Sequence, residues 1–437
     1  MSTPLDTAYN RLDEAHRAWH TALNGYHRIE DFRAGINTAI QALRNLTFAL
    51  QKQKDSLPDF DTWYGSWQEK MRDNPLLKEL HEARSIIVKQ EDLKLYSVGT
   101  ARTKGWVDFQ KMTFTFDPTS DSYDVAKGFY DTYVIHLPIA EEVKQRLIFE
   151  FERKWIYNKL PNDELLDAIA QAYRFFSAML KDAEIKFSIS PRENKSTGDY
   201  CSAELNDDEQ LRCMILTPQE RCLSFSFKDG GILTIQTGSI SRSEADLRKV
   251  HDRYGDFWES EDILSLLEGT FPDEYPFDEM KLFAQVALSN LKRDGHLIPT
   301  SFIFNEKGTA PMIISHPFQN QESKVMVIDK VASAIIKNKA KFVLMVAELW
   351  QYKIDGSRKN IPTENDTRGT KDLFQASCVS ADKLKIITIP FRKNIFGKVI
   401  FSKTEVTDYL TTEEHHKYIL MPLINALQQN SKQSFSE

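Results

Sequence analysis

Apolar and polar positions alternate along residues 6–90 with the period of an α-helix. In four successive segments the apolar side chains recur at steps of three and four residues, which places them on one stripe of a helix. The stripe of the first segment consists of Tyr9, Leu12, Ala15, Trp19, Leu23 and Tyr26. The fourth segment begins with Asn74 and Pro75, an N-cap residue followed by the residue favoured in the first helical position. Four amphipathic helices joined by connections of modest length predict a helical bundle.

Residues 96–294 combine helical and strand periods. We expect a helix that opens at Pro138 and runs towards Tyr157, and a second helix along Leu166–Leu180. Further on, Asp229-Gly230-Gly231 is a hairpin signal between two strand-like arms. The region closes with an amphipathic helix that ends in the residues Lys-Arg-Asp-Gly at 292–295. Basic residues followed by glycine predict a helix C-cap there.

From residue 295 onward, strand-like segments dominate the pattern. They lie at residues 296–305, 311–316, 341–352, 374–390 and 397–404, with helices at 325–338 and 412–429. This order predicts a largely antiparallel sheet packed by two helices. The predicted fold class is therefore α+β, with an N-terminal four-helix bundle at 1–95, a mixed helical and β-hairpin region at 96–294, and a C-terminal antiparallel-sheet domain with a basic face at 295–437.

The composition is that of a protein with one or more hydrophobic cores. Of the 437 residues, 41% are hydrophobic and 27% are charged, which excludes collagen-like, coiled-coil-only and disordered classes. The densest apolar run, Phe342 to Ala347, is far shorter than the roughly 20 residues that span a bilayer, so we expect no membrane association. The N-terminus lacks the basic start and the apolar run of a secretory signal, which favours a cytoplasmic protein.

Motifs for metals, cofactors and common enzyme classes are missing from the sequence. The four cysteines form no Cys-x-x-Cys pair, which argues against a disulfide framework or a zinc ribbon. Cys201, Cys213 and Cys222 lie close in sequence, but their spacing matches no common zinc pattern, so ordinary buried thiols are favoured. No P-loop, dinucleotide-binding, esterase-elbow or zincin motif occurs. We expect no metal and no cofactor, and enzymatic activity is not favoured.

The segments Phe32–Gln53, Trp63-Tyr64 and Leu76–Asp92 resemble the HEPN-like four-helix domains (higher eukaryotes and prokaryotes nucleotide-binding) of bacterial proteins. Active members of that superfamily carry an arginine, four to six spacer residues and a histidine on the last bundle helix, and they cleave RNA without a metal. Here Arg84 and four spacers are followed by Lys89. Because lysine is protonated at neutral pH and is a poor base, the resemblance implies phosphate affinity without ribonuclease activity.

Arg44 and Arg84 each border the apolar stripe of their helix. In one interpretation their stems lie along the bundle while their charged heads reach water. In the other they face an inward polar pocket that binds phosphate or nucleotide. The first is favoured because Asp31, Glu79 and Glu82 are placed to pair with them.

Charge is distributed unevenly along the chain. Residues 324–403 carry a net charge of +9, whereas the rest of the chain carries −16. Such a basic region is the electrostatic footprint of contact with a phosphate backbone. The candidate nucleic-acid-binding residues are Lys337, Lys339, Lys341, Arg358, Lys359, Arg392 and Lys393. Trp350, Phe391 and Phe396 are candidates for stacking on bases. An ordinary solvated face and core packing are the alternative explanation.

Together these patterns predict a non-catalytic or weakly catalytic factor associated with RNA or single-stranded DNA. The HEPN resemblance implies a setting in anti-phage defence or in a toxin–antitoxin system. A metal-independent ribonuclease that uses Arg84 is the first alternative. An oligomeric scaffold is the second, either a homo-oligomer or a subunit of a partner protein, with Trp63 and Trp67 as interface aromatics.

Overall fold

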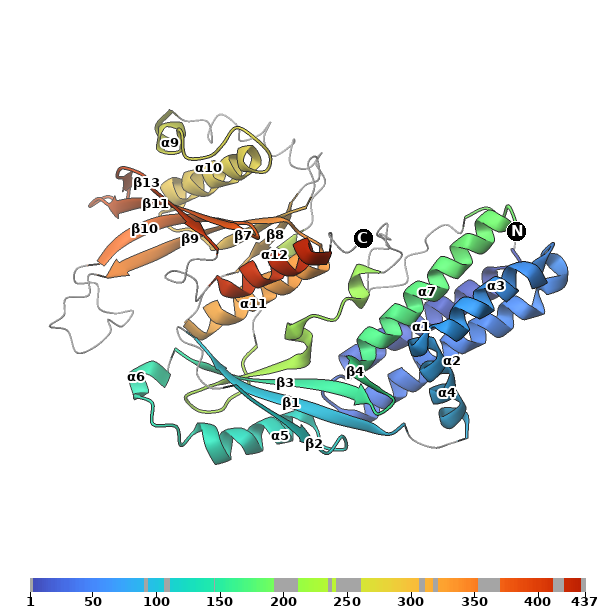
Figure 1. The fold of residues 1–437 in the computed structure, drawn as a ribbon. Helices are drawn as coiled ribbons and strands as arrows, with labels where there is room; N and C mark the ends of the chain where they lie inside the picture. The colour runs from blue at the N-terminus through green and yellow to red at the C-terminus, as the bar shows by residue number, and fades with distance from the viewer. Residues whose placement is uncertain are drawn as a thin grey trace. The chain divides into compact units, whose positions relative to one another are not determined.

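The computed structural model shows an α+β protein with two antiparallel sheets (Figure 1). It divides into two compact units. Unit 1 consists of Met1–Thr103, Phe109–Leu137 and Phe149–Phe225, and unit 2 of Lys104–Asp108, Pro138–Ile148 and Ser226–Glu437. The residues described are 3–89, 93–105, 111–144, 146–191, 211–234, 238–240, 261–305, 311–316, 321–352, 370–411 and 420–433. No helix among them is long and apolar enough to cross a membrane.

The predicted α+β class is confirmed, and so are the four N-terminal helices. They are α1 (Asp6–Asn24), α2 (Ile29–Lys52), α3 (Phe60–Asp73) and α4 (Pro75–Val88). Asn74 caps α4, because its side chain accepts a hydrogen bond from the backbone N–H of Leu77 at 3.2 Å. A fifth helix, α7 (Leu165–Lys186), completes the same core.

The tryptophans that the sequence offered as interface residues are core residues of the bundle. Trp63 and Trp67 are each 7% exposed. Both indole N–H groups donate to the same oxygen of Asp182, at 2.7 and 2.8 Å, which satisfies the polar edge of each ring. The expectation that they form an interface was therefore wrong, and they give no reason to expect self-association.

The first sheet belongs to unit 1 and has the order β2-β1-β3-β4, with β5 paired to β3. Its strands are β1 (Leu95–Lys104), β2 (Lys111–Phe116), β3 (Ile148–Tyr157), β4 (Leu160–Glu164) and β5 (Cys222–Ser226). Helix α5 (Ser122–Phe129) follows β2. The predicted helix from Pro138 to Tyr157 is wrong, since only α6 (Glu141–Lys144) is helical before β3 begins.

Strand β3 was mistaken for a helix because it is buried on both faces and still contains charged residues. All of its side chains except Lys154 are buried. Glu152 accepts a hydrogen bond from Arg221 Nε at 2.9 Å, and Glu150 pairs with Arg102. Such a strand shows neither the period-two alternation nor the uninterrupted apolar run that identifies a strand.

Arg153 is the third charged residue that β3 buries. Its guanidinium donates to Ser97 Oγ and to the carbonyl oxygens of Pro118 and Ser120, at 2.7 to 2.9 Å. It lies 3.4 Å from the ring centroid of Trp155. Burial lowers the pKa of Arg153 to about 9. The carbonyls and the π-face compensate for lost hydration, because buried polar groups must be hydrogen-bonded.

The second sheet belongs to unit 2 and has the order β12-β11-β10-β9-β7-β8-β6, with β13 also paired to β11. Its strands are β6 (Gly238–Ile240), β7 (Thr300–Phe304), β8 (Met312–Ser315), β9 (Phe342–Tyr352), β10 (Thr370–Val379), β11 (Lys383–Lys393), β12 (Val399–Phe401) and β13 (Glu405–Leu410). The predicted strand 374–390 is two strands, because Ser380 N donates to Lys383 O and closes a turn between them.

Helices cover both faces of this sheet (Figure 1). Helices α9 (Glu261–Leu266) and α10 (Phe277–Asp294) lie on one face, and α11 (Gln321–Lys337) and α12 (Met421–Gln433) on the other. Along β9, Leu344 and Val346 join the core under α10, while Val343 and Met345 join the core under α11 and α12. The predicted C-cap of α10 is confirmed by Gly295, whose φ of 73° lies in the left-handed region.

Glu164 connects the bundle to the first sheet from a buried position. Its Oε2 accepts from the backbone N–H groups of Leu166 and Asp167 at 2.7 and 3.2 Å and so caps α7, while Oε1 lies 3.0 Å from the hydroxyl oxygen of Tyr26. Burial, with the nearby charge of Asp167, raises the pKa of Glu164 to about 7. The folded state therefore favours the protonated carboxyl.

Glu164→Gln should remove a pH-dependent penalty. Because the pKa is raised from its ordinary value of 4.5 to about 7 on folding, the wild type carries no penalty below pH 4.5 and the full penalty above pH 7. Between pH 4.5 and pH 7, we expect the difference in free energy of unfolding between the variant and the wild type to shift by roughly 1–3 kcal/mol in favour of the variant. Urea unfolding at several pH values measures the difference. Parallel pH profiles would contradict the assignment.

Candidate nucleic-acid interface

The sequence-predicted basic residues lie on different elements of unit 2. Lys337 ends α11, Lys339 follows it with a positive φ of 49°, and Lys341 directly precedes β9. Arg392 and Lys393 are the last two residues of β11. Arg358 and Lys359 lie outside the described residues.

The strand register separates these residues into two groups. Val343 at the start of β9 pairs with Val379 on β10, and Val379 pairs with Leu384 on β11. At the other end of the sheet, Gln351 pairs with Lys371, and the adjacent Asp372 pairs with Phe391. The lysines at 337–341 and the pair at 392–393 are therefore about ten residues apart along the strands, or roughly 30 Å at 3.3 Å per residue. No single patch includes both groups.

The turn between β11 and β12 holds its backbone in one conformation. The Asn394 side-chain oxygen accepts hydrogen bonds from the backbone N–H groups of Phe396 and Lys398, both at 2.9 Å. Asn394 N donates to Lys398 O at 3.0 Å. Gly397 has a φ of 75°, a conformation that glycine adopts without a steric penalty. The tip of this hairpin is thus organised by its own hydrogen bonds.

Two large apolar side chains project from this tip. Ile395 is 92% exposed and Phe396 is 80% exposed. Phe391, by contrast, is 5% exposed and packs against Phe401, so it cannot stack on a base. The side chain of Trp350 lies outside the described part of the chain. Of the three aromatic candidates, Phe396 is the residue whose described position leaves its ring accessible.

Cationic side chains surround the tip. Arg392, Lys393 and Lys398 are exposed. Lys393 Nζ lies 4.0 Å from Glu348 Oε1, whereas Arg392 and Lys398 form no ion pair with any other described residue. The C-cap of α10 lies alongside, since a Cβ placed on Gly295 would be 3.9 Å from the carbonyl oxygen of Gly397. We define the tip hairpin as residues 392–398.

Of the tip hairpin, Arg392 and Lys393 were predicted from the sequence, whereas Asn394 and Ile395 were not. A signal for both was present. Residues in a turn are normally polar or glycine, yet the string Asn-Ile-Phe-Gly at 394–397 places two large apolar residues between a turn-forming asparagine and a glycine. An apolar pair in the middle of a turn breaks the binary pattern without a folding benefit.

The two residues matched to the HEPN motif lie in the helical bundle. Lys89 is the exposed C-cap of α4, and Arg84 is half-buried with its guanidinium 5.9 Å from the ring centroid of Phe48. Arg44 lies over the same ring at 4.6 Å. Partial burial, together with the charges of Arg44 and Arg84, lowers the pKa of His81.

A cavity of about 400 Å³ lies among α2, α3, α4 and α7. Its basic lining residues are Arg44, Arg72, Lys78 and His81, and no acidic side chain lines it. Arg84 is not among the lining residues. Arg44 therefore lines this cavity, whose other lining residues include Ile40, Leu43, Leu77 and Phe176.

Replacing Ile395 and Phe396 with serine should leave stability unchanged, because side chains that are this exposed contribute little to folding. Phe391→Ser is the matched control and should lower the free energy of unfolding by roughly 3–5 kcal/mol. Chemical denaturation of the three proteins tests this. A loss above about 1 kcal/mol in the double variant would show that the tip packs against another part of the chain.

Comparison with known proteins corrects the resemblance drawn from the N-terminal helices. The family model described as bacteriophage lambda protein ea47 matches residues 1–434. Protein ea47 of Escherichia phage lambda is 23% identical over 347 residues, which cover 78% of each chain. No solved structure matches the chain. The HEPN resemblance was wrong: it rested on helix texture that many bundles share, whereas the family match covers both units. The chain belongs to the bacteriophage lambda ea47 family.

Proposed function

We propose that the tip hairpin binds single-stranded nucleic acid and that the protein is a non-catalytic nucleic-acid-associated factor. Phe396 would stack on an unpaired base, and Arg392 and Lys398 would contact the flanking phosphates. The observation that carries the proposal is the exposure of Ile395 and Phe396 at the end of a cationic hairpin whose turn is closed by hydrogen bonds.

The chemistry of the tip fits a polymer of bases and phosphates. Arg392 pairs with Ile400 across the two strands and Lys398 directly precedes β12, so each arm of the hairpin carries one of the two cations. Sequence-tolerant binding of single strands combines positive charge with aromatic platforms in this way. A duplex hides its base faces by stacking, which is why single strands are the favoured ligand.

The wider charge of unit 2 supports the approach of such a ligand. Residues 324–403 carry a net charge of +9 within a chain whose total is −7. Attraction between a basic region and a polyanion raises the association rate even where no direct contact forms. The lysines at 337–341 would contribute in this way from the other end of the sheet.

Other sequence-based hypotheses lose their support. Defence, toxin–antitoxin and ribonuclease roles all rested on the HEPN resemblance, and the family match replaces it. The scaffold hypothesis rested on Trp63 and Trp67, which are buried. An exposed apolar tip would also suit a protein partner, and the experiment below separates that case.

Phe396→Ala should weaken binding of the full chain to a fluorescent single-stranded oligonucleotide about tenfold at low salt, because one lost base–aromatic stack is worth about 1–3 kcal/mol. Phe396→Trp should retain affinity. Arg392→Glu combined with Lys398→Glu should lower affinity and reduce the salt slope by about 1.4, since two phosphate contacts are lost. Fluorescence anisotropy with RNA and DNA, titrated across salt concentrations, provides all three values.

Lys337→Glu combined with Lys341→Glu is the matched charge control at the opposite end of the sheet. It changes the net charge equally, so a smaller effect than that of the tip variant would locate the contact at the tip. Equal losses of affinity in the two charge variants would show that binding depends on overall charge and not on the tip. An absence of binding by the wild type at low salt would reject nucleic acid and leave a protein partner for the tip.

A further inference from the structure

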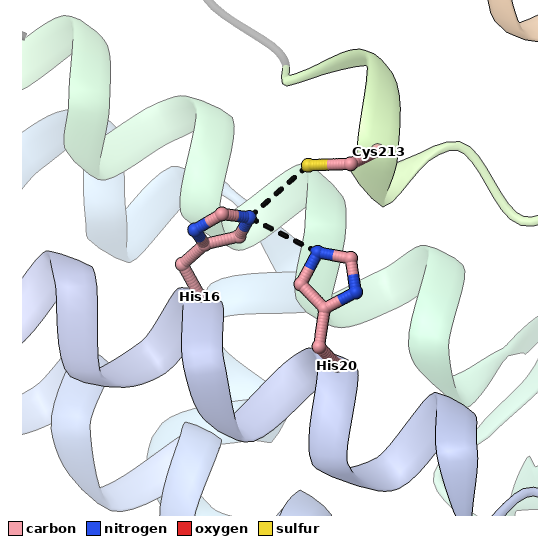
Figure 2. Close-up of side chains that lie close together, drawn as sticks. All are labelled: His16, His20 and Cys213. Carbon is pink, nitrogen blue, oxygen red and sulfur yellow. Dashed lines mark hydrogen bonds between the residues drawn. The ribbon is translucent and has the colours of Figure 1, made fainter. Parts of the chain in front are cut away.

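Three potential metal ligands meet inside unit 1. His16 and His20 project from the same face of α1 towards Cys213 (Figure 2). His16 Nε2 lies 3.1 Å from Cys213 Sγ and 3.1 Å from His20 Nε2. All three donor atoms lie within 4.8 Å of one another.

The local fold explains why these side chains converge. Residues four apart on a helix lie on one face, so His16 and His20 point in the same direction. Cys213 is the middle residue of a 3-10 turn, Arg212–Met214. The turn is held against the bundle core by Met214, which is 1% exposed, and by Leu211 and Leu216 on either side.

The ring of His20 is fixed by its neighbours. It packs edge-on against Trp19 with ring centroids 5.1 Å apart. Trp19 is anchored in turn, because its indole N–H donates to the carbonyl oxygen of Leu166 at 2.9 Å. Packing of this kind restricts rotation of the His20 ring.

Two of the three distances are close to those of a tetrahedral zinc site. With zinc–nitrogen bonds of about 2.05 Å and zinc–sulfur bonds of about 2.3 Å, the edges of a tetrahedron are roughly 3.3 Å between nitrogens and 3.6 Å between nitrogen and sulfur. The two separations from His16 Nε2, both 3.1 Å, differ from these edges by a few tenths of an ångström. All three ligand atoms lie within 4.8 Å of one another, so rotation of the His20 and Cys213 side chains completes the site around an ion.

A hydrogen-bonded cluster alone is a poorer description of the same geometry. His16 Nε2 faces both the thiol and the other imidazole, yet in either tautomer it carries one proton or one lone pair, so it can form only one well-directed hydrogen bond with these two partners.

We propose that His16, His20 and Cys213 bind one zinc ion. On binding, the Cys213 thiol loses its proton to solvent and its sulfur coordinates as thiolate, while each imidazole contributes the lone pair of Nε2. Two nitrogens and one sulfur suit zinc and leave one position for water. His16 is fully buried, whereas Cys213 is partly exposed, so the ion enters from the side of Cys213.

The site departs from the expectation that the chain holds no metal. The spacing of Cys213 from the neighbouring cysteines gives no metal signal, because His16 lies 197 residues away from it on α1. The detectable signal was the i, i+4 spacing of His16 and His20, which is a metal-binding spacing on a helix. The ion would attach the segment 211–216 to α1.

Zinc binding can be tested on the full chain after removal of metal with a chelator. We expect about one equivalent of zinc by competition with a chromophoric chelator, and a thiolate-to-metal charge-transfer band when cobalt(II) replaces zinc. Cys213→Ser should remove the band and weaken zinc binding at least about 100-fold. Cys222→Ser is the matched control and should retain both, because Cys222 contacts Arg102 and not the histidines.

A measurement on the wild type keeps the test independent of variant folding. Bound zinc should slow alkylation of Cys213 by more than about tenfold while Cys222 reacts at an unchanged rate, as followed by peptide mass spectrometry. If the wild type binds no zinc, if Cys213→Ser binds it equally, or if Cys213 is not protected, the three residues form only a hydrogen-bonded cluster and the proposal is overturned.

Discussion

Unit 1 is organised by the charged side chains that strand β3 carries into its interior. A charge withdrawn from water persists only where opposite charges or polar atoms surround it, so these residues select what can pack on the strand. Glu152 accepts a hydrogen bond from Arg221, and Arg153 donates to carbonyl oxygens of the turn that follows β2. Because Arg221 follows Cys213 by eight residues, the same pairing fixes the segment that reaches α1.

The elements predicted correctly are those whose signals are local. Helices α1 to α4 show their period within a few turns, and Asn74 and Gly295 mark helix ends through their own backbone chemistry. Strand β3 carries no such signal, because its charges are explained only by distant partners. The division between β10 and β11 was also missed, since Ser380 and Asp382 form a short turn that no glycine or proline marks in the sequence.

The candidate sites, too, could be predicted only in part from local sequence signals. The basic residues at 337–341 and 392–393 belong to one region of sequence, and only the pairing of β9 with β10 and of β10 with β11 places them at opposite ends of the sheet. Residue type alone did not determine the exposure of Phe396, because Phe391, five positions earlier in the same basic segment, is buried. Turn geometry separates the two residues.

Burial determines what a metal at His16 would do. A catalytic ion needs an open position that a substrate can reach. His16 and His20 are 0% and 6% exposed, and aromatic rings and the turn around Cys213 enclose them. Such an ion would stabilise the fold, because it binds only when α1 and residues 211–216 are in contact. Its binding energy then adds to the stability of that contact. The tip hairpin differs in this respect, since Ile395 and Phe396 are exposed and remain available for a ligand.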